Sequence, residues 1–383
     1  MQTWYFNEAA YPYLPDESTY DSIRVSLPNG LYDPKIGAAL WDRYLDEWVV
    51  ADELGLNVMV NEHHATATCM NPAAPLISGI LARITKNARI VLLGNPIANR
   101  PDPVRVAEEM ALVDNLSHGR LEVGFVRSVP YEVLPSNASP VGMAERMWEA
   151  HDLIKKAWTT TDGPFSWEGK YFQFRSVNIW PRPFQQPHPP IWMSSRSVSG
   201  AAEIGERGYV CATFLGGHKG AKVVYDSYKA RREELGLSAP APDRFAYAGL
   251  VYTGDTEESG REGAEKLLWY MRANKVPIQF KNPPGYASVG ANIGAVKSSG
   301  PGNLIPENTS LDSLIEQGIV FAGNPDQVYE QIKRFNDRVG GIGHFLLMGQ
   351  SGFLEHDETV VGLQNYAKHV QPRLAELELS TVG

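Results

Sequence analysis

The stretch Asn57-Val58-Met59-Val60-Asn61-Glu62-His63-His64 joins a short apolar run to a cluster of polar side chains. An apolar run of this length is typical of a buried β-strand. In folds built on a parallel sheet, the groups that carry out chemistry lie at the carboxyl ends of the strands. The stretch therefore predicts a parallel α/β fold whose functional site includes the side chains that follow this strand.

Outward from this strand, short strand candidates alternate with amphipathic helix candidates, the pattern of repeated βα units. Eight strands are expected, at residues 3–6, 57–60, 89–93, 121–125, 191–194, 209–213, 245–251 and 343–348. Helices are expected at residues 40–54, 103–116, 144–158, 223–235, 257–272, 325–337 and 358–377, the last with a candidate kink at Pro372. Eight parallel strands close a barrel that their own side chains fill. The predicted fold is a single (β/α)8 TIM barrel domain of the α/β class, covering residues 1–383, with insertions.

Two segments interrupt the alternation. Residues 164–174 place aromatic residues on both sides of a Glu-Gly turn, which predicts a β-hairpin insertion after the fourth strand. Residues 276–310 are rich in Gly, Pro, Asn and Ser and precede the eighth strand. A connection this long in a compact domain is usually a functional lid or a disordered piece, and a passive surface loop is the alternative. We expect a mobile, lid-like loop there.

Bulk properties limit the class of protein. The chain has 383 residues, of which 43% are hydrophobic and 21% charged, as in an ordinary soluble enzyme. A formal charge of −9 argues against nucleic acid or an anionic membrane as a partner. Cys69 and Cys211 lack CxxC spacing, the first residues do not form a signal peptide, and no apolar run approaches the ~20 residues of a membrane span. These features favour a cytoplasmic enzyme without a structural disulfide.

Small or polar residues also follow other predicted strands. The third strand is followed by Gly94 and Asn95, and the fourth by Arg127. After the fifth strand comes a serine-rich turn that opens a helix, where backbone N–H groups and the helix N-terminus favour an anion. The candidate anion-binding residues are Arg127, Arg146, Arg196, Ser197, Val198, Ser199 and Gly200. The alternative is an ordinary helix cap with surface arginines.

The paired histidines permit three interpretations. His63 and His64 suit proton transfer or contact with a cofactor, because the unperturbed pKa of histidine lies near neutrality. They could equally form a structural hydrogen-bonded pair or bind zinc, although no HExxH motif or convincing third ligand is present, so no metal is predicted. With Glu62 they are the candidate catalytic residues. The chain also lacks GxGxxG, Walker A and GxSxG motifs, which disfavours Rossmann, P-loop and α/β-hydrolase enzymes.

Several blocks, in this order, resemble the bacterial luciferase-like, flavin-dependent monooxygenases. The most specific are residues 61–64, residues 94–109 and residues 114–121, followed by Phe125-Val126-Arg127 and the segment from the aromatic hairpin to Trp192. The resemblance spans nearly the whole chain, from residue 40 to residue 373. It implies a TIM-like barrel, usually dimeric, that binds reduced FMN at the carboxyl end of the strands.

The resemblance also implies a function and partners. Such enzymes take FMNH2 from a separate NAD(P)H:flavin reductase, react it with O2 to form a flavin (hydro)peroxide, and oxygenate an organic substrate. We expect a two-component monooxygenase acting on a small apolar molecule, because aromatic residues such as Trp4, Phe125 and Trp192 are predicted near the mouth of the barrel. The alternatives are a deazaflavin-dependent hydride-transfer enzyme of the same superfamily, a metal hydrolase using His63 and His64, and a non-catalytic flavin-binding homologue.

Individual roles follow from the family's motifs. His63 corresponds to the histidine that acts as catalytic acid and base, and Arg127 and Arg146 to arginines near the phosphate. The turn at residues 197–200 corresponds to the phosphate-binding turn, and a non-proline cis peptide that faces the flavin ring is expected at Gly94-Asn95. This chain departs from its nearer relatives in carrying Ser194-Ser195-Arg196-Ser197 after the fifth strand, where they have a Gly- and Pro-containing turn.

Overall fold

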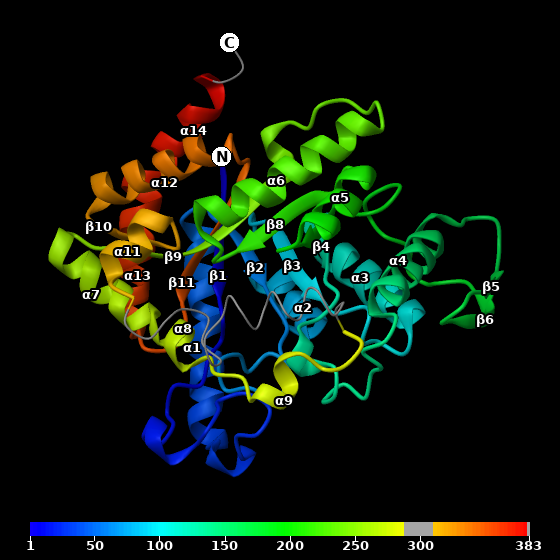
Figure 1. Ribbon diagram of the computed structural model, residues 1–383, viewed down its shortest axis with the longest axis horizontal. Coiled ribbons are helices and arrows are strands. Elements are labelled where there is room, and N and C mark those ends of the chain that lie inside the picture. The colour runs from blue at the N-terminus through cyan, green and yellow to red at the C-terminus, as the bar shows by residue number, and fades with distance from the viewer. Residues whose placement is uncertain (287–308, 381–383) are drawn as a thin grey trace.

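The barrel is formed by eight parallel strands wound around a common axis (Figure 1). The computed structural model describes residues 1–286 and 309–380. The barrel strands are β1 (Gln2–Asn7), β2 (Asn57–Val60), β3 (Ile90–Asn95), β4 (Leu121–Phe125), β7 (Ile191–Ser194), β8 (Val210–Phe214), β9 (Phe245–Thr253) and β11 (His344–Gln350). They pair in this order, and β11 returns to β1, which closes the cylinder. The predicted TIM barrel and all eight predicted strands are confirmed.

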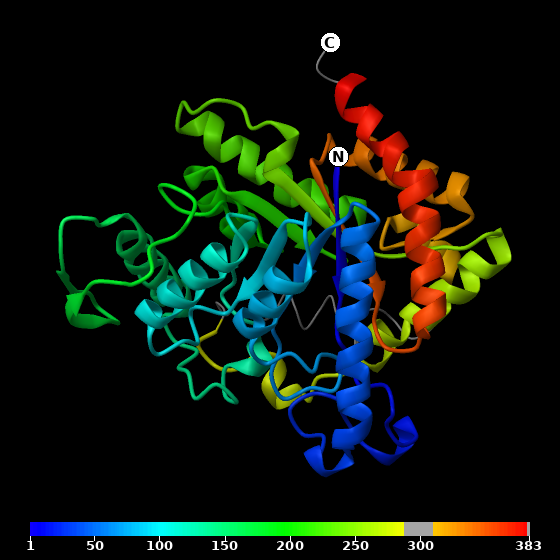
Figure 2. The same cartoon turned by 180° about the vertical axis from the view of Figure 1, so that it is seen from behind.

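Helices cover the outside of the barrel (Figures 1 and 2). They are α1 (Pro34–Glu53), α2 (Ala74–Ile84), α3 (Pro103–Leu116), α4 (Met143–Thr159), α5 (Val198–Arg207), α6 (Gly217–Glu234), α7 (Glu257–Leu267), α8 (Trp269–Ala273), α9 (Ile278–Lys281), α11 (Leu311–Gln317), α12 (Pro325–Val339), α13 (His356–Asn365) and α14 (Gln371–Ser380). Proline at the first position and a side-chain cap begin α1, α3 and α12. A cap residue followed by proline marks a helix start in the sequence. Proline fits there because the N–H at the first helical position has no partner within the helix.

A ninth strand, β10 (Val320–Gly323), was not among those expected. It pairs in parallel with Leu250–Thr253 of β9, whereas β8 pairs with Phe245–Ala248. Both β8 and β10 therefore lie along one edge of β9 and occupy different halves of it. The nine residues of β9 are long enough to serve both neighbours.

The two predicted insertions have different outcomes. Strands β5 (Phe165–Glu168) and β6 (Gln173–Val177) pair antiparallel, which confirms the hairpin after the fourth strand. Of the expected lid-like loop at 276–310, residues 287–308 lie outside the described residues. Its first part contains the short helix α9, which packs against the 3₁₀ turn η3 (Pro130–Glu132).

Some helix predictions need correction. The single helix expected at 257–272 divides into α7 and α8, and α6 begins six residues before the expected start at residue 223. The closing helix contains a π-helical turn at Tyr366–Val370 immediately before α14, instead of a kink centred on Pro372. Proline has no N–H and its ring crowds the preceding turn, so the wider π-turn accommodates it.

Trp4 and Trp192 fill the inside of the barrel. Their rings meet edge to face with centroids 5.2 Å apart, and both are fully buried. Phe125 lies on the other side of the sheet, where it stacks on Trp158 at 6.0 Å. The expectation that Trp4, Phe125 and Trp192 lie near the mouth is therefore wrong, because core packing takes these large apolar side chains. In the described part of the chain, no helix is both long and apolar enough to cross a membrane.

Candidate active site

His63 lies just beyond the end of β2 and faces a buried carboxylate. Its Nδ1 donates a hydrogen bond to Oε1 of Glu132 at 2.7 Å, and the backbone N–H of His64 donates to the same oxygen at 3.2 Å. Glu132 belongs to η3 after β4, and its side chain is only 2% exposed. Within the described residues, Nε2 of His63 has no hydrogen-bond partner. The arrangement fixes the ring through Nδ1 and leaves Nε2 available for proton transfer.

The charge of Glu132 is held by its surroundings. Burial alone would raise the pKa of this carboxyl, but His63 and Arg24 together lower it below the ordinary glutamate value. The carboxylate is therefore ionised near neutral pH and accepts the Nδ1 hydrogen bond of His63. This is the electrostatic arrangement expected of a histidine that gives and takes protons.

His64 is bound to Glu62 instead. Its Nε2 lies 3.0 Å from Oε1 of Glu62, and this hydrogen bond raises the pKa of His64. Glu62 also accepts from Arg100 at 2.6 Å and from the backbone N–H of Ala74 at 3.0 Å. Glu62 is fully occupied by these bonds, so it orients His64 and the loop after β3. The structure brings the predicted residues Glu62, His63 and His64 together.

A second buried acid follows β1. Glu8 accepts a hydrogen bond from Nδ2 of Asn61 at 2.7 Å, and Tyr270 hydrogen-bonds to it as well. Burial raises the pKa of Glu8 despite the opposing effects of His63, Asn61 and Arg24. Two carboxyl groups thus lie near His63. The raised pKa of Glu8 favours its neutral form, and the lowered pKa of Glu132 favours its ionised form.

The end of β3 presents a buried amide. Asn95 is fully buried, and its Oδ1 accepts from Arg100 at 3.4 Å. Its Nδ2 has no hydrogen-bond partner in the described part of the chain. The cis peptide joins Leu93 to Gly94, one residue earlier than the expected position. A Cβ at Gly94 would lie 2.3 Å from Cγ1 of Val126, so only glycine fits this close approach. Gly94 and Asn95 both lie inside β3. The pairing of β3 with β4 shifts register between Leu92 and Asn95.

The predicted arginines differ in their surroundings. The guanidinium of Arg127 lies 4.4 Å from the centre of the Tyr286 ring, and the Tyr286 hydroxyl donates to the carbonyl of Ser128 at 2.7 Å. Arg146 donates to the carbonyls of Ala98 at 2.7 Å and Ser139 at 2.8 Å, which ties two loops together. Arg127 therefore keeps more of its hydrogen-bonding capacity for a ligand than Arg146 does.

The turn after β7 caps a helix. Ser197 accepts a hydrogen bond from the N–H of Gly200 at 3.1 Å at the start of α5. Arg196, Ser197, Val198 and Ser199 are exposed, and Gly200 is partly exposed. Because all barrel strands are parallel, this turn lies at the same end of the barrel as the other predicted residues.

Glu8, Arg24 and Glu132 were missed in the sequence. Glu8 follows Asn7 directly after the first strand, so the strand-end rule applied to His63 would have found it. Glu132 and Arg24 lie in irregular loops, and no local pattern marks their approach to His63.

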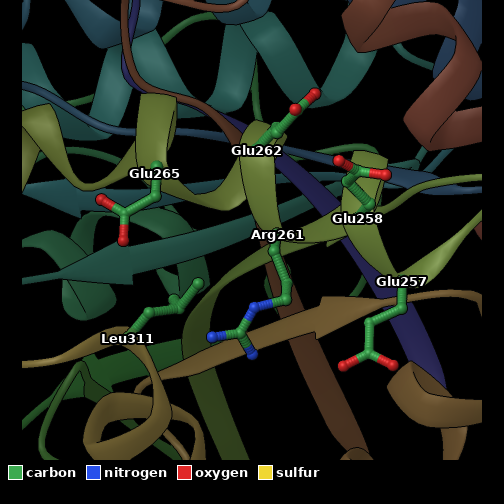
Figure 3. A pocket seen from close by; sticks show the side chains of 6 residues that line it. All are labelled: Glu257, Glu258, Arg261, Glu262, Glu265 and Leu311. Carbon is green, nitrogen blue, oxygen red and sulfur yellow. The ribbon is translucent and has the colours of Figure 1, made fainter.

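Other features of the described residues are less suited to catalysis. A hollow of about 560 Å³ lies along α7 and is lined by four glutamates, Arg261 and Leu311 (Figure 3). None of the residues at the strand ends lines it, and Arg261 is paired with Asp312 at 2.8 Å. In residues 1–286 and 309–380, no group of three His, Cys, Asp or Glu residues is arranged to hold a metal ion.

A family model and individual proteins of similar sequence both match this chain. A family model described as luciferase-like monooxygenase matches residues 28–340. The chain is 27% identical over 257 residues to the oxygenase component of the flavin-dependent trigonelline monooxygenase of Acinetobacter baylyi, covering 65% of this chain and 69% of that protein. It is 24% identical over 351 residues to 2,5-diketocamphane 1,2-monooxygenase 1 of Pseudomonas putida, covering 85% and 91%.

Solved structures share the fold. One is the oxygenating constituent of 3,6-diketocamphane monooxygenase of Pseudomonas putida in complex with FMN, with a TM-score of 0.71, 19% identity and coverage of 97% and 98%. Another is an F420-dependent secondary alcohol dehydrogenase, with a TM-score of 0.68, 18% identity and coverage of 97% and 99%. At these identities the likeness concerns the barrel alone.

Proposed function

We propose, from the premise that the chain belongs to the luciferase-like monooxygenase family, that it is the oxygenase of a two-component system. In this function it binds reduced FMN, uses O2, and transfers one oxygen atom to a small organic substrate. The observation that carries the proposal is the hydrogen-bonded pair of His63 and Glu132 at the carboxyl end of β2.

The residues at the strand ends fit a flavin. The side chain of Asn95 has a buried, unpartnered Nδ2 that would donate to a carbonyl oxygen of the flavin ring. Gly94 allows the backbone to approach a flat ligand closely. Arg127, Arg146 and Arg196 supply positive charge for a phosphate, and the turn at residues 197–200 supplies N–H donors. A reduced flavin held there would supply the electrons that activate O2.

His63 is the proposed acid and base. Glu132 holds Nδ1, so Nε2 is the atom that exchanges a proton with the reacting groups. Glu62 keeps the segment after β2 in place, because it is bonded to both His64 and Arg100. The acid–base role requires a histidine with one nitrogen fixed and the other free, and this geometry supplies it.

The system also requires partners. A separate NAD(P)H:flavin reductase would supply FMNH2, as the component name of the trigonelline enzyme suggests. We expect a homodimer, because Leu76, Leu112 and Leu116 on the neighbouring helices α2 and α3 expose 66%, 49% and 49% of their surface. Light scattering of the purified protein measures the oligomeric state.

Oxygen incorporation tests the proposal most directly. The purified chain, FMN, NADH and a generic flavin reductase are incubated with a substrate panel under ¹⁸O2, and products are analysed by mass spectrometry. One ¹⁸O atom per product molecule is expected. Turnover without O2 by a reduced deazaflavin would support the hydride-transfer alternative.

Two further results would support the remaining alternatives. Stoichiometric zinc in active protein would favour a hydrolase, although His63 and His64 are bound to different carboxylates. FMN binding without any product, across the panel, would favour a non-catalytic flavin-binding protein.

A further inference from the structure

Arg24 is a fully buried cation with two unused nitrogens. Its side chain has 0% exposure, and its Nε donates to Oδ1 of Asn274. Among the residues that the structure describes, Nη1 and Nη2 have no hydrogen-bond partner. One face of the guanidinium lies on the ring of Tyr131, 4.5 Å from the ring centre. The side chain is thus held in place at its base and on one face, and its terminal pair of nitrogens is unoccupied.

The backbone of Arg24 lies beside the segment that carries the histidines. Arg24 forms a β-bridge with Thr66, and the N–H of Val25 donates to the carbonyl of Ala65 at 2.6 Å. The stacking partner Tyr131 directly precedes Glu132, the residue that holds His63. Arg24 therefore belongs to the same end of the barrel as the proposed acid–base pair.

The nearby carboxyl groups do not satisfy Arg24. Glu132 uses Oε1 for His63 and the N–H of His64, and Glu8 accepts from Asn61. Neither makes a hydrogen bond to Nη1 or Nη2 of Arg24. Burial also raises the pKa of Glu8, which favours its neutral form and weakens its pairing with the cation. A buried guanidinium with unmet donors is costly in folding free energy, so its presence calls for an explanation, and a bound anionic ligand supplies one.

We propose that Nη1 and Nη2 of Arg24 bind a carboxylate group of the organic substrate. The two nitrogens form a planar fork that matches the two oxygens of a carboxylate. This inference rests on the proposed oxygenase function, because it identifies the substrate class of that site. The carboxylate would anchor one end of the substrate at Arg24 and leave the rest of the molecule near His63.

Binding of small acids tests the inference without flavin or turnover. Acetate, hexanoate, cyclohexanecarboxylate and benzoate are each compared with the primary amide of the same acid by calorimetric titration of the purified full-length protein. At least one acid is expected to bind the wild type about tenfold or more tightly than its amide. In Arg24→Met this preference disappears. In Arg24→Lys, which keeps the charge and loses the fork, it is reduced.

A matched variant and a stability measurement complete the design. Arg334→Met removes an equal charge from an exposed residue of α12 and should leave the preference for acids unchanged. Arg24→Met is expected to melt at a lower temperature than the wild type, because it loses the bond to Asn274 and the positive charge beside Glu132. Circular dichroism at the titration temperature checks that the variant is folded, and Arg24→Lys, which keeps the charge, tests the fork if Arg24→Met does not fold.

The inference is overturned if no acid binds more tightly than its amide, or if Arg24→Met retains the preference. The failure of the proposed function is a separate result: acids would bind through Arg24, and ¹⁸O would not enter any product.

Discussion

His63 and His64 are adjacent in the chain, yet each is bound by a different buried carboxylate. Glu132 comes from the loop after β4, whereas Glu62 is a neighbour in sequence. The His63 side chain is therefore held by a segment distant in sequence, and the His64 side chain by its neighbour Glu62. This difference separates their expected roles: His63 exchanges protons, and His64 supports the loop on which both stand.

Replacing His63 tests the first role. His63→Ala should lower the rate of substrate oxygenation about 100-fold or more, which is the usual contribution of a general acid or base. The Kd for FMN and the melting temperature should change little, because the ring makes one partly exposed hydrogen bond. Product formation is measured at saturating FMNH2. Retention of the wild-type rate would refute the assignment.

The pKa of His64 predicts a pH-dependent contribution to stability. Its hydrogen bond to Glu62 raises the pKa of His64 in the folded protein. The bond therefore contributes fully below the unfolded pKa of about 6.5 and is lost as pH rises through the folded pKa. In urea unfolding, His64→Gln should be less stable than the wild type by about 1 kcal/mol at pH ~6, and the difference should shrink by pH ~9. A difference that is independent of pH would contradict this.

Arg127 should affect flavin binding more than turnover. A phosphate contact stabilises the bound cofactor equally in the ground state and the transition state. Arg127→Ala is therefore expected to raise the Kd for FMN about tenfold or more, and to change kcat at saturating flavin by less than about threefold. Fluorescence titration and steady-state rates measure the two quantities. An unchanged Kd would remove Arg127 from the phosphate site.

At the scale of elements, the hairpin formed by β5 and β6 depends on one side chain of α4. The carboxylate of Glu149 accepts from the backbone N–H groups of Tyr171 and Phe172, at 3.0 Å and 2.9 Å, and from Nε1 of Trp167 at 3.3 Å. Without this carboxylate, two backbone donors of the hairpin lose their partner. The hairpin is thus anchored to the barrel by a charged group and not by strand pairing.

Glu149→Ala should loosen the hairpin while the barrel stays folded. Amide hydrogen exchange at Tyr171 and Phe172 should accelerate about tenfold or more, since each loses an acceptor worth about 1–3 kcal/mol. Exchange within β1 and β11 should not change. Glu145→Ala is the matched control, because Glu145 contacts the hairpin only through the exposed Lys170 and the Tyr171 hydroxyl. Equal effects of the two variants would contradict the anchoring role.

The sequence predicted the strands and helices better than it predicted which distant residues contact one another in the folded protein. Each barrel strand is an apolar run bounded by turn residues, so a local pattern was sufficient. Strand β10 was missed because a strand of only four residues leaves a weak local signal. The predicted site residues reach one end of the barrel, but Glu132 and Arg24 could not be found, because their approach to His63 depends on how two irregular loops fold over the strand ends. The aromatic residues assigned to the mouth were misplaced because apolarity alone does not distinguish a ligand pocket from a core.

At the scale of the whole molecule, the tryptophans inside the barrel fill its central space. Trp4 on β1 contacts Trp192 on β7 and donates from Nε1 to Nδ1 of His344 on β11 at 3.2 Å. Burial lowers the pKa of His344 to about 4, so the ring is neutral and can accept this hydrogen bond at physiological pH. These side chains thereby connect β7 with the paired strands β1 and β11 through the inside of the cylinder.

Trp4→Ala should destabilise the entire barrel. Removing a large, fully buried side chain leaves a cavity, and the expected loss is about 3–5 kcal/mol in the free energy of unfolding. Guanidinium unfolding followed by circular dichroism measures this loss. Trp180→Ala is the control, because Trp180 is 84% exposed, and it should change stability by less than about 0.5 kcal/mol. Equal losses in the two variants would show that the interior is not tightly packed.

Strands β8 and β10 pair with different halves of the same edge of β9. Closure of the cylinder therefore does not depend on how many residues connect β9 to β10. Closure needs only the pairing of β8 with the first half of β9, while β10 attaches to the second half. The intervening polypeptide leaves β9 at one end and rejoins its side through β10. The described part of this polypeptide packs against the barrel through α7 and bonds Arg24 through Asn274. A substitution in it can therefore alter the surroundings of the site while the hydrogen bonds that hold the ring of eight strands together stay intact.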